Sequence, residues 1–401
     1  MLTASAGCST GESPSVEPAF SLAPPVALAS PAAVNSGEPF VHAASDGTVL
    51  ISWLEPADSA HALRFARLTG TQWSEPRTIA SSSTFFVNWA DFPSIVELAD
   101  GRLAAHWLAR SGPGTYAYDV WIAFSDDDGV TWSEPVRPHD DGTQTEHGFV
   151  SLFETAGAPA AVWLDGRNYA DHDGMPAANE MTLRFTTFDA DGRPVNGSRI
   201  DARVCDCCQT AVAVAASGPI LAYRDRSADE IRDISISRLV GGAWTDPVTV
   251  HNDQWQINAC PVNGPGIDAD GNSVAVAWFT AAQDTARVRV AFSDDSGATF
   301  HDAIRIDLGN PVGRVDVIML DGSRALVAWL ERTGGTAEVL ARTVSTDGTL
   351  GDPLSIGGSS AERASGFPRM ARAGSRIVFA WTVPGTEAAI RVSAIRLLAD
   401  E

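Results

Sequence analysis

Four of the five cysteines lie in two segments that could bring their thiols together. Cys205, Cys207 and Cys208 stand in the stretch ARVCDCCQT, and Cys260 follows in HNDQWQINACPVNGP. Thiolates gathered at one point would bind a soft metal ion, for which Cu(I) and Zn²⁺ are the candidates. In an oxidising compartment the same residues could form two disulfides, although a vicinal pair reaches two separate partners only with strain. A redox-active thiol pair is the third interpretation.

Imidazole and charged side chains accompany these thiols. His251 and His147 are candidate additional metal ligands. Carboxylates could supply acid/base chemistry of the kind that cleaves glycosidic bonds, and arginines could hold a substrate carboxylate with two hydrogen bonds. Arg–Asp pairs that only order the loops are the alternative. The candidates are Glu146, Asp165, Arg167, Arg224, Asp225 and Arg226.

Two further segments, FSDDDGVTW and FSDDSGATF, share one turn pattern. The Ser, Asp and Thr side chains can bond to the backbone across a tight bend, and the glycine supplies the positive φ that the bend needs. We expect the final aromatic residue to fold back beneath the turn. The residues are Ser125, Asp127, Gly129, Thr131 and Trp132 in the first copy, and Ser293, Asp295, Gly297, Thr299 and Phe300 in the second.

This pattern is the Asp-box, and the chain resembles the sialidase and BNR-repeat propellers. The resemblance implies an all-β propeller in which the Asp-boxes are structural turns on the face away from the ligand-binding mouth. It also implies three arginines, a late Tyr nucleophile activated by Glu, and an Asp acid/base. Here the region of the first arginine reads EPFVH, and every tyrosine precedes residue 224. We therefore expect the fold without sialidase activity; a glycosidase using other carboxylates is the alternative.

Seven apolar segments recur along the chain, 51 to 60 residues apart, and predict seven four-stranded blades. Six are followed by a fourth strand of their own, and PPVALAS near the N-terminus can supply the seventh, which would close the ring. Six blades is the alternative count. We expect the aromatic residue of each segment to pack between blades. These residues are Trp53, Trp107, Trp163, Tyr223, Trp278, Trp329 and Trp381.

Composition and the N-terminus bear on location and partners. The net charge of −22 argues against nucleic acid or an anionic membrane as a partner. The start, MLTASAGC, is similar to the end of a bacterial lipoprotein signal, so we expect Cys8 to be lipidated and the protein to be exported to the periplasm or cell envelope. Residues 1–22 would then be signal remnant and tether, and residues 23–401 the propeller. No apolar stretch is long enough to span a membrane.

The expected partner is a small glycan, a metal ion or an envelope protein, bound by a monomer. For the protein partner, the segment SSSTFFVNWAD could present Phe85, Phe86 and Trp89 as an exposed anchor.

Overall fold

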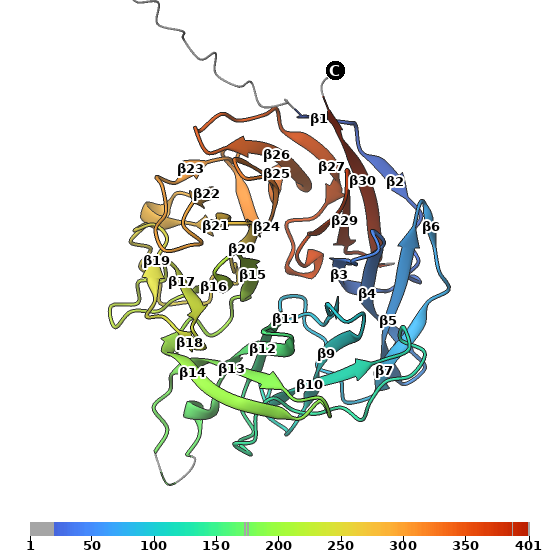
Figure 1. Cartoon of the computed structure of the whole chain (residues 1–401), viewed down its shortest axis with the longest axis vertical. Coiled ribbons are helices and arrows are strands. Elements are labelled where there is room, and N and C mark those ends of the chain that lie inside the picture. The colour runs from blue at the N-terminus through green and yellow to red at the C-terminus, as the bar shows by residue number, and fades with distance from the viewer. Residues whose placement is uncertain (1–19, 172–173, 175, 387, 400–401) are drawn as a thin grey trace, which may run out of the picture.

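The computed structural model describes residues 20–171, 174, 176–386 and 388–399. Within these ranges the chain forms seven antiparallel sheets arranged in a ring, which makes it a seven-bladed β-propeller (Figure 1). The prediction of seven blades is confirmed, and the alternative of six is wrong. The blades are numbered 1 to 7 from the one that contains β3.

The first four blades follow one another along the chain. Blade 1 contains β3 (Gly37–Ala43), β4 (Val49–Ala57), β5 (Ala60–Thr69), β6 (Gln72–Trp73) and β7 (Arg77–Ser82). Blade 2 contains β8 (Ser94–Glu97), β9 (Leu103–Arg110) and β10 (Tyr118–Ser125). Blade 3 contains β11 (His147–Thr155), β12 (Ala158–Asp165), β13 (Met181–Phe188) and β14 (Pro194–Val204). Blade 4 contains β15 (Ala211–Ala215), β16 (Gly218–Arg224), β17 (Ile234–Val240), β18 (Ala243–Trp244) and β19 (Val248–Thr249).

The last three blades complete the ring. Blade 5 contains β20 (Gly266–Asp270), β21 (Ser273–Thr280), β22 (Arg287–Ser293) and β23 (Ile304–Arg305). Blade 6 contains β24 (Pro311–Asp321), β25 (Arg324–Thr333), β26 (Thr336–Ser345) and β27 (Leu354–Ser359). Blade 7 contains β28 (Arg369–Ala373), β29 (Arg376–Val383), β30 (Ala389–Ala399), β1 (Phe20–Leu22) and β2 (Val26–Leu28). Three short 3₁₀ turns lie in loops: η1 (Arg167–Tyr169), η2 (Ala282–Asp284) and η3 (Arg363–Ser365).

The N-terminal strands close the ring, as predicted. Both β1 and β2 pair antiparallel with β30, with Ser21 opposite Leu398 and Val26 opposite Ala394. The two ends of the described chain therefore meet in blade 7 (Figure 1). Because β1 ends at Leu22, pairing begins before the predicted boundary at residue 23. The closure covers the outer edge of β30, which would otherwise present unpaired backbone groups.

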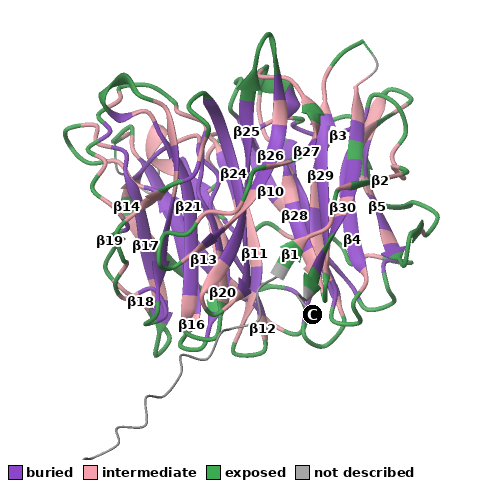
Figure 2. Cartoon of the chain, turned by 90° about the horizontal axis from the view of Figure 1, so that it is seen from above, coloured by how far each residue is buried: buried purple, intermediate pink, exposed green. Residues whose placement is uncertain are grey.

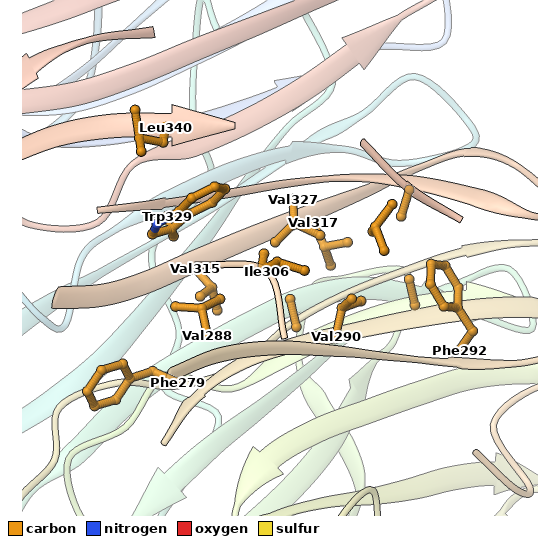
Figure 3. Packing of buried hydrophobic residues seen from close by; sticks show 14 of the residues in the cluster. Phe279, Val288, Val290, Phe292, Ile306, Val315, Val317, Val327, Trp329 and Leu340 are labelled. Atoms are coloured by element: carbon orange, nitrogen blue, oxygen red, sulfur yellow. The ribbon is translucent and has the colours of Figure 1, made fainter. Parts of the chain in front are cut away.

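Blades pack on one another through apolar side chains of their strands. Between blades 5 and 6, Val288 and Val290 lie against Val317 and Val327, and Trp329 covers one end of this layer (Figure 3). Trp329 is completely buried, as is Trp53 between blades 7 and 1. The predicted packing role of the recurring tryptophans agrees with this placement.

The buried indoles need hydrogen-bond acceptors, and three blades solve this in the same way. A carboxylate two residues along the strand accepts the indole N–H: Trp53 Nε1 lies 2.7 Å from Glu55 and Trp329 Nε1 lies 2.6 Å from Glu331. In blade 3 the same arrangement joins Trp163 to Asp165 at 2.9 Å. Asp165 therefore has the same structural role as Glu55 and Glu331. Like them, it stands two residues after a recurring tryptophan.

The two Asp-boxes form the predicted turns after β10 and β22. Ser125 Oγ accepts a hydrogen bond from the Gly129 N–H at 2.8 Å, and Asp127 accepts from the backbone and hydroxyl of Thr131 at 2.8 and 2.7 Å. These bonds lower the pKa of Asp127. The second box repeats the same bonds. Trp132 lies beneath the first turn, edge-on to Phe65.

We predict that Gly129→Ala destabilises the fold more than Gly47→Ala. Both glycines have positive φ, +75° and +80°, so alanine costs about 1 kcal/mol of conformational strain at either position. At Gly129 the new methyl group would also meet the Phe65 ring, whereas no described atom lies within 4 Å of it at Gly47. Overpacking adds about 1–3 kcal/mol, which chemical denaturation would measure. Equal losses for the two variants would show that the Phe65 contact is unimportant.

Candidate metal centre and cavity at the channel mouth

Three cysteines converge in the connection between blades 3 and 4. Cys205 Sγ lies 3.3 Å from Cys208 Sγ and 3.9 Å from Cys207 Sγ. The segment is fixed to blade 4 because the Cys205 N–H donates to the Arg224 carbonyl, next to an isolated bridge between Val204 and Asp225. Cys260, from the connection between blades 4 and 5, makes a thiol contact with Cys207. All four are free thiols, and Cys205 and Cys208 are buried.

The surroundings of the cluster favour one thiolate. Burial opposes ionisation of Cys205, but hydrogen bonds from the Cys207 and Cys208 thiols and the positive charge of Arg224 hold its pKa well below the ordinary value. Arg232 also donates to Cys205 Sγ at 3.4 Å. The same thiol–thiol bonds raise the pKa of Cys207, and burial raises that of Cys208. The cluster therefore favours the negative charge on Cys205 over the other two sulfurs, beside two arginines.

Arg224 does not reach the channel mouth as a ligand-binding group. Its guanidinium is buried and donates to the backbone carbonyls of Asn263, Arg232 and Phe279 at 2.6 to 3.0 Å. It also stacks over the Trp255 ring at 4.9 Å. These bonds occupy the guanidinium donors, so Arg224 ties blades 4 and 5 together.

The other predicted residues of blade 4 also make internal bonds. Arg226 pairs with Glu230 at 2.8 Å and reaches Asp206 at 3.3 Å. Asp225 accepts hydrogen bonds from the backbone of Arg226 and from the Ser235 hydroxyl. Burial and the charge of Asp201 raise the pKa of Asp225 to about 6. The loop-ordering interpretation of these Arg–Asp pairs fits their contacts.

A cavity of about 550 Å³ lies at the mouth. Apart from Phe149 in β11, its lining residues lie in connections between blades or in loops between the second and third strands of a blade. Loops and rims are the exposed parts of the molecule (Figure 2). Two of the clustered cysteines open onto the cavity, together with aromatic and acidic side chains. Its lining includes Trp89, Tyr116, Glu146, Tyr169, Cys207 and Cys260.

Glu146 belongs to a chain of three hydrogen-bonded groups. The Tyr118 hydroxyl lies 2.7 Å from Glu146 Oε1 and 2.9 Å from Asp91 Oδ2. One hydroxyl proton cannot serve two carboxylates, so one of the carboxyl groups must itself be protonated. Burial raises the pKa of Glu146 to about 8 and that of Asp91 to about 7. Glu146, on the cavity wall, therefore favours the neutral form at pH 7.

The two predicted histidines lie away from the cysteines. His147 is stacked on His139 in a buried cluster with Asp141, Asp165 and Arg167. His251 lies instead beside Asp253, Arg289 and Trp278. The expectation that an imidazole joins the thiols is not met by the described arrangement.

The proposed anchor for a protein partner is also contradicted. Phe85 and Phe86 are both 7% exposed, and Phe86 stacks on Tyr118 inside blade 2. Trp89 lines the cavity and stacks on Phe367 at a ring separation of 6.1 Å. The apolar side chains of this segment therefore serve the core and the cavity wall.

Several residues of the mouth escaped sequence reasoning. Asp91 comes from the connection between blades 1 and 2 and Tyr118 from the start of β10, and they meet Glu146 only in the folded ring. Asp206, which also lines the cavity and accepts a hydrogen bond from Tyr169 at 3.0 Å, stands within the cysteine motif itself. Its position between Cys205 and Cys207 was the one available signal.

Two predictions concern the attachment of the protein to a membrane. Cys8, the predicted lipidation site, lies outside the described residues. Among the residues that the structure describes, no helix has the length and apolar character needed to cross a bilayer.

Comparisons with known proteins support the fold. A protein of unknown function from Dyadobacter fermentans DSM 18053 superposes with a TM-score of 0.54 at 13% identity, covering 94% of this chain and 99% of that one. The phage phi92 endosialidase gives a TM-score of 0.52 at 10% identity, over 95% and 70% of the two chains. The NanB sialidase from Streptococcus pneumoniae gives 0.46 at 14% identity, over 90% and 68%.

No family model and no curated protein matches the chain. The structural neighbours show a sialidase-like propeller fold, and at these identities they show the fold alone.

We predict that Glu146→Gln changes the pH dependence of stability. The folded protein holds the Glu146 proton more tightly than the unfolded chain, because the pKa rises from 4.5 to about 8. The resulting stabilisation is complete below the unfolded pKa and is lost as the pH rises through the folded one. The variant carries no such proton. Its stability relative to wild type should therefore rise between about pH 5 and about pH 8, by up to about 1.4 kcal/mol per pH unit.

Urea denaturation at several pH values measures this difference. Glu75→Gln, at an exposed turn, is the matched control for removing one carboxylate. Parallel stability curves for wild type and Glu146→Gln would contradict the assignment of a neutral Glu146.

Proposed function

We propose that this sialidase-like propeller binds a soft metal ion, Cu(I) or Zn²⁺, through Cys205, Cys207 and Cys208 at the channel mouth, with Cys260 as the fourth ligand. The observation that supports it most strongly is the convergence of three sulfur atoms from four consecutive residues, all within 4.8 Å of one another. Thiolates are the ligands that Cu(I) and Zn²⁺ prefer.

The sulfur separations favour a shared ion over disulfides. Four thiolates at about 2.3 Å from a tetrahedral ion lie about 3.8 Å apart, whereas a disulfide joins its sulfur atoms at about 2.05 Å. The separations of 3.3 and 3.9 Å fall near the first value. Arg224 and Arg232 supply positive charge that balances a site with three or four thiolates.

The metal proposed here would face a ligand-binding space. Cys207 and Cys260 line the cavity, and Cys260 is exposed. With Cys260 as the fourth ligand the site is closed, as structural zinc sites are, and displacement of this exposed thiol would open a coordination position toward the cavity. We also propose that the protein is an exported lipoprotein anchored through Cys8, on the basis of the MLTASAGC segment.

A second candidate function is acid-catalysed cleavage of a glycoside in the same cavity. The neutral Glu146 side chain could protonate a leaving group, and aromatic side chains such as Trp89 and Tyr116 suit contact with sugar rings. Asp206 is the second carboxylate of the cavity lining. Asp165 and Asp225, the other predicted carboxylates, make the internal contacts described above and are not required by this proposal.

We expect Cys207→Ser to abolish soft-metal binding and to leave the fold intact, because blade packing and the Asp-boxes lie elsewhere. Native mass spectrometry of the protein loaded with Cu(I) or Zn²⁺ should show one ion that is lost in the variant. Cys260→Ser should weaken binding without abolishing it. Cysteines that resist alkylation after denaturation, together with no bound ion, would establish two disulfides and overturn the proposal.

The glycosidase alternative predicts turnover that depends on Glu146. A panel of chromogenic glycosides should include at least one substrate that the protein cleaves and that Glu146→Gln cleaves at least 100-fold more slowly, because the general acid is lost. Glu75→Gln is again the control. No turnover across the panel would count against the alternative and leave the metal proposal unaffected.

A further inference from the structure

A second set of metal-binding groups lies between blades 2 and 3, separate from the cysteines. It consists of Asp119 on β10, His139 in the following connection, and His147 at the start of β11. The side chains of His139, His147 and Asp119 are 2%, 0% and 7% exposed. Buried imidazoles and carboxylates need hydrogen-bond partners, so the partner of each of their polar atoms has to be identified.

One side of each imidazole is satisfied by a shared carboxylate. The two rings stack in parallel, with centroids 3.8 Å apart. Asp141 Oδ2 lies 3.2 Å from His147 Nε2 and 3.5 Å from His139 Nδ1. Asp141 is itself held by Thr143 and by Arg167, whose Nη2 lies 3.1 Å away. Asp141 therefore fixes both rings from one side.

The other side of each imidazole lacks a partner. Among the described residues, neither His139 Nε2 nor His147 Nδ1 has a hydrogen-bond partner, and both atoms are buried. Both nitrogens face Asp119 Oδ1, at 3.9 and 3.6 Å, which is too long for a hydrogen bond. Arg137 donates to the other Asp119 oxygen at 3.0 Å and leaves Oδ1 without that bond. An unpaired buried nitrogen costs free energy that a bound ion would recover.

We propose that Asp119, His139 and His147 bind a divalent transition-metal ion, with Zn²⁺ as the first candidate, independently of the cysteine cluster. Ligands at 2.0–2.2 Å from a tetrahedral ion lie about 3.4 Å apart. The observed separations are a few tenths of an ångström longer. The two rings would also have to turn out of their parallel stack, so that the free nitrogen of each ring points to the same ion. Asp141 then plays the part of the outer carboxylate that orients metal-bound histidines.

The competing occupant of this site is a proton. Burial lowers the pKa of His147, but Asp141, Asp165 and Asp119 outweigh it and raise the pKa above the ordinary value. A metal ion would compete with the His147 proton when it binds. Arginine charges from Arg137, Arg167 and Arg184 offset the three carboxylates, so they limit the affinity of the site.

The two sites differ in the hardness of their ligands. Imidazole and carboxylate suit Zn²⁺, Co²⁺ and Ni²⁺, whereas the thiols suit Cu(I) as well. Co²⁺ is therefore the probe that distinguishes them, because thiolate ligands add an intense near-ultraviolet charge-transfer band and nitrogen and oxygen ligands do not.

The test uses the full chain carrying Cys207→Ser, which removes the first site. This protein should bind one Co²⁺ or Zn²⁺, with visible cobalt absorption and without the thiolate band. Adding Asp119→Asn or His139→Gln should reduce affinity at least 100-fold. His106→Gln is the matched control, because His106 is also buried but bonds to Ser94 at 2.8 Å, away from the carboxylates.

A second measurement leaves Asp119, His139 and His147 unaltered, so its result does not depend on whether the substituted variants fold. In ¹⁵N-histidine spectra of the Cys207→Ser protein, zinc should shift ring nitrogens of two of the eight histidines. Zinc-independent spectra, or full binding retained in both Asp119→Asn and His139→Gln, would overturn the proposal and identify the cluster as a proton-bound ion network.

Discussion

Closure of the ring is the constraint on which the rest of the structure depends. Each blade buries its faces only against its two neighbours, so an open array would leave one face of the first and last blades in water. The apolar layer that joins blades 7 and 1, with Val41 and Trp53 on one side and Val378 and Val392 on the other, removes that cost. The pairing of β2 with β30 fixes the N-terminal segment, which leads into blade 1, to the sheet of blade 7.

A closed ring gathers loops that are far apart in the chain. Segments near residues 89, 116, 146, 207, 260 and 363 line one cavity because each lies in a loop or connection on the same rim. The rigid sheets then decide the chemistry of the loops. Glu146 favours the neutral form because the ring buries it beside Asp91 and Tyr118. Cys205 favours the thiolate because folding brings the Cys207 and Cys208 thiols and the Arg224 charge to it.

The fold also separates two classes of ligand. Thiols occupy the connections on either side of blade 4, whereas imidazoles and their carboxylates lie between blades 2 and 3. His147 belongs to the second group although it directly follows Glu146, which faces the cavity. Adjacent residues at the start of a strand point to opposite sides, so one residue of sequence separates the cavity wall from the buried cluster.

The sequence by itself determined the features that repeat or act locally. The spacing of the tryptophan segments gave seven blades, the PPVALAS segment indicated the closing strand, and the Asp-box residues specified turns whose bonds span only four residues. The three clustered cysteines were visible because they stand within four residues of one another. Local patterns suffice where the physical contacts are local.

Only the tertiary structure decided which distant side chains meet. Arg224 resembles a ligand-binding arginine in sequence, but folding directs it to three carbonyls, and Asp165 accepts the Trp163 indole proton. The register between neighbouring strands and loops decides two further interactions. One is the hydrogen bonding of Tyr118 to Asp91 and Glu146, and the other is the stacking of His139 on His147. The periodicity of apolar residues predicts that a strand exists. It does not predict which polar atoms the strand will bury, because burial is set by the whole ring.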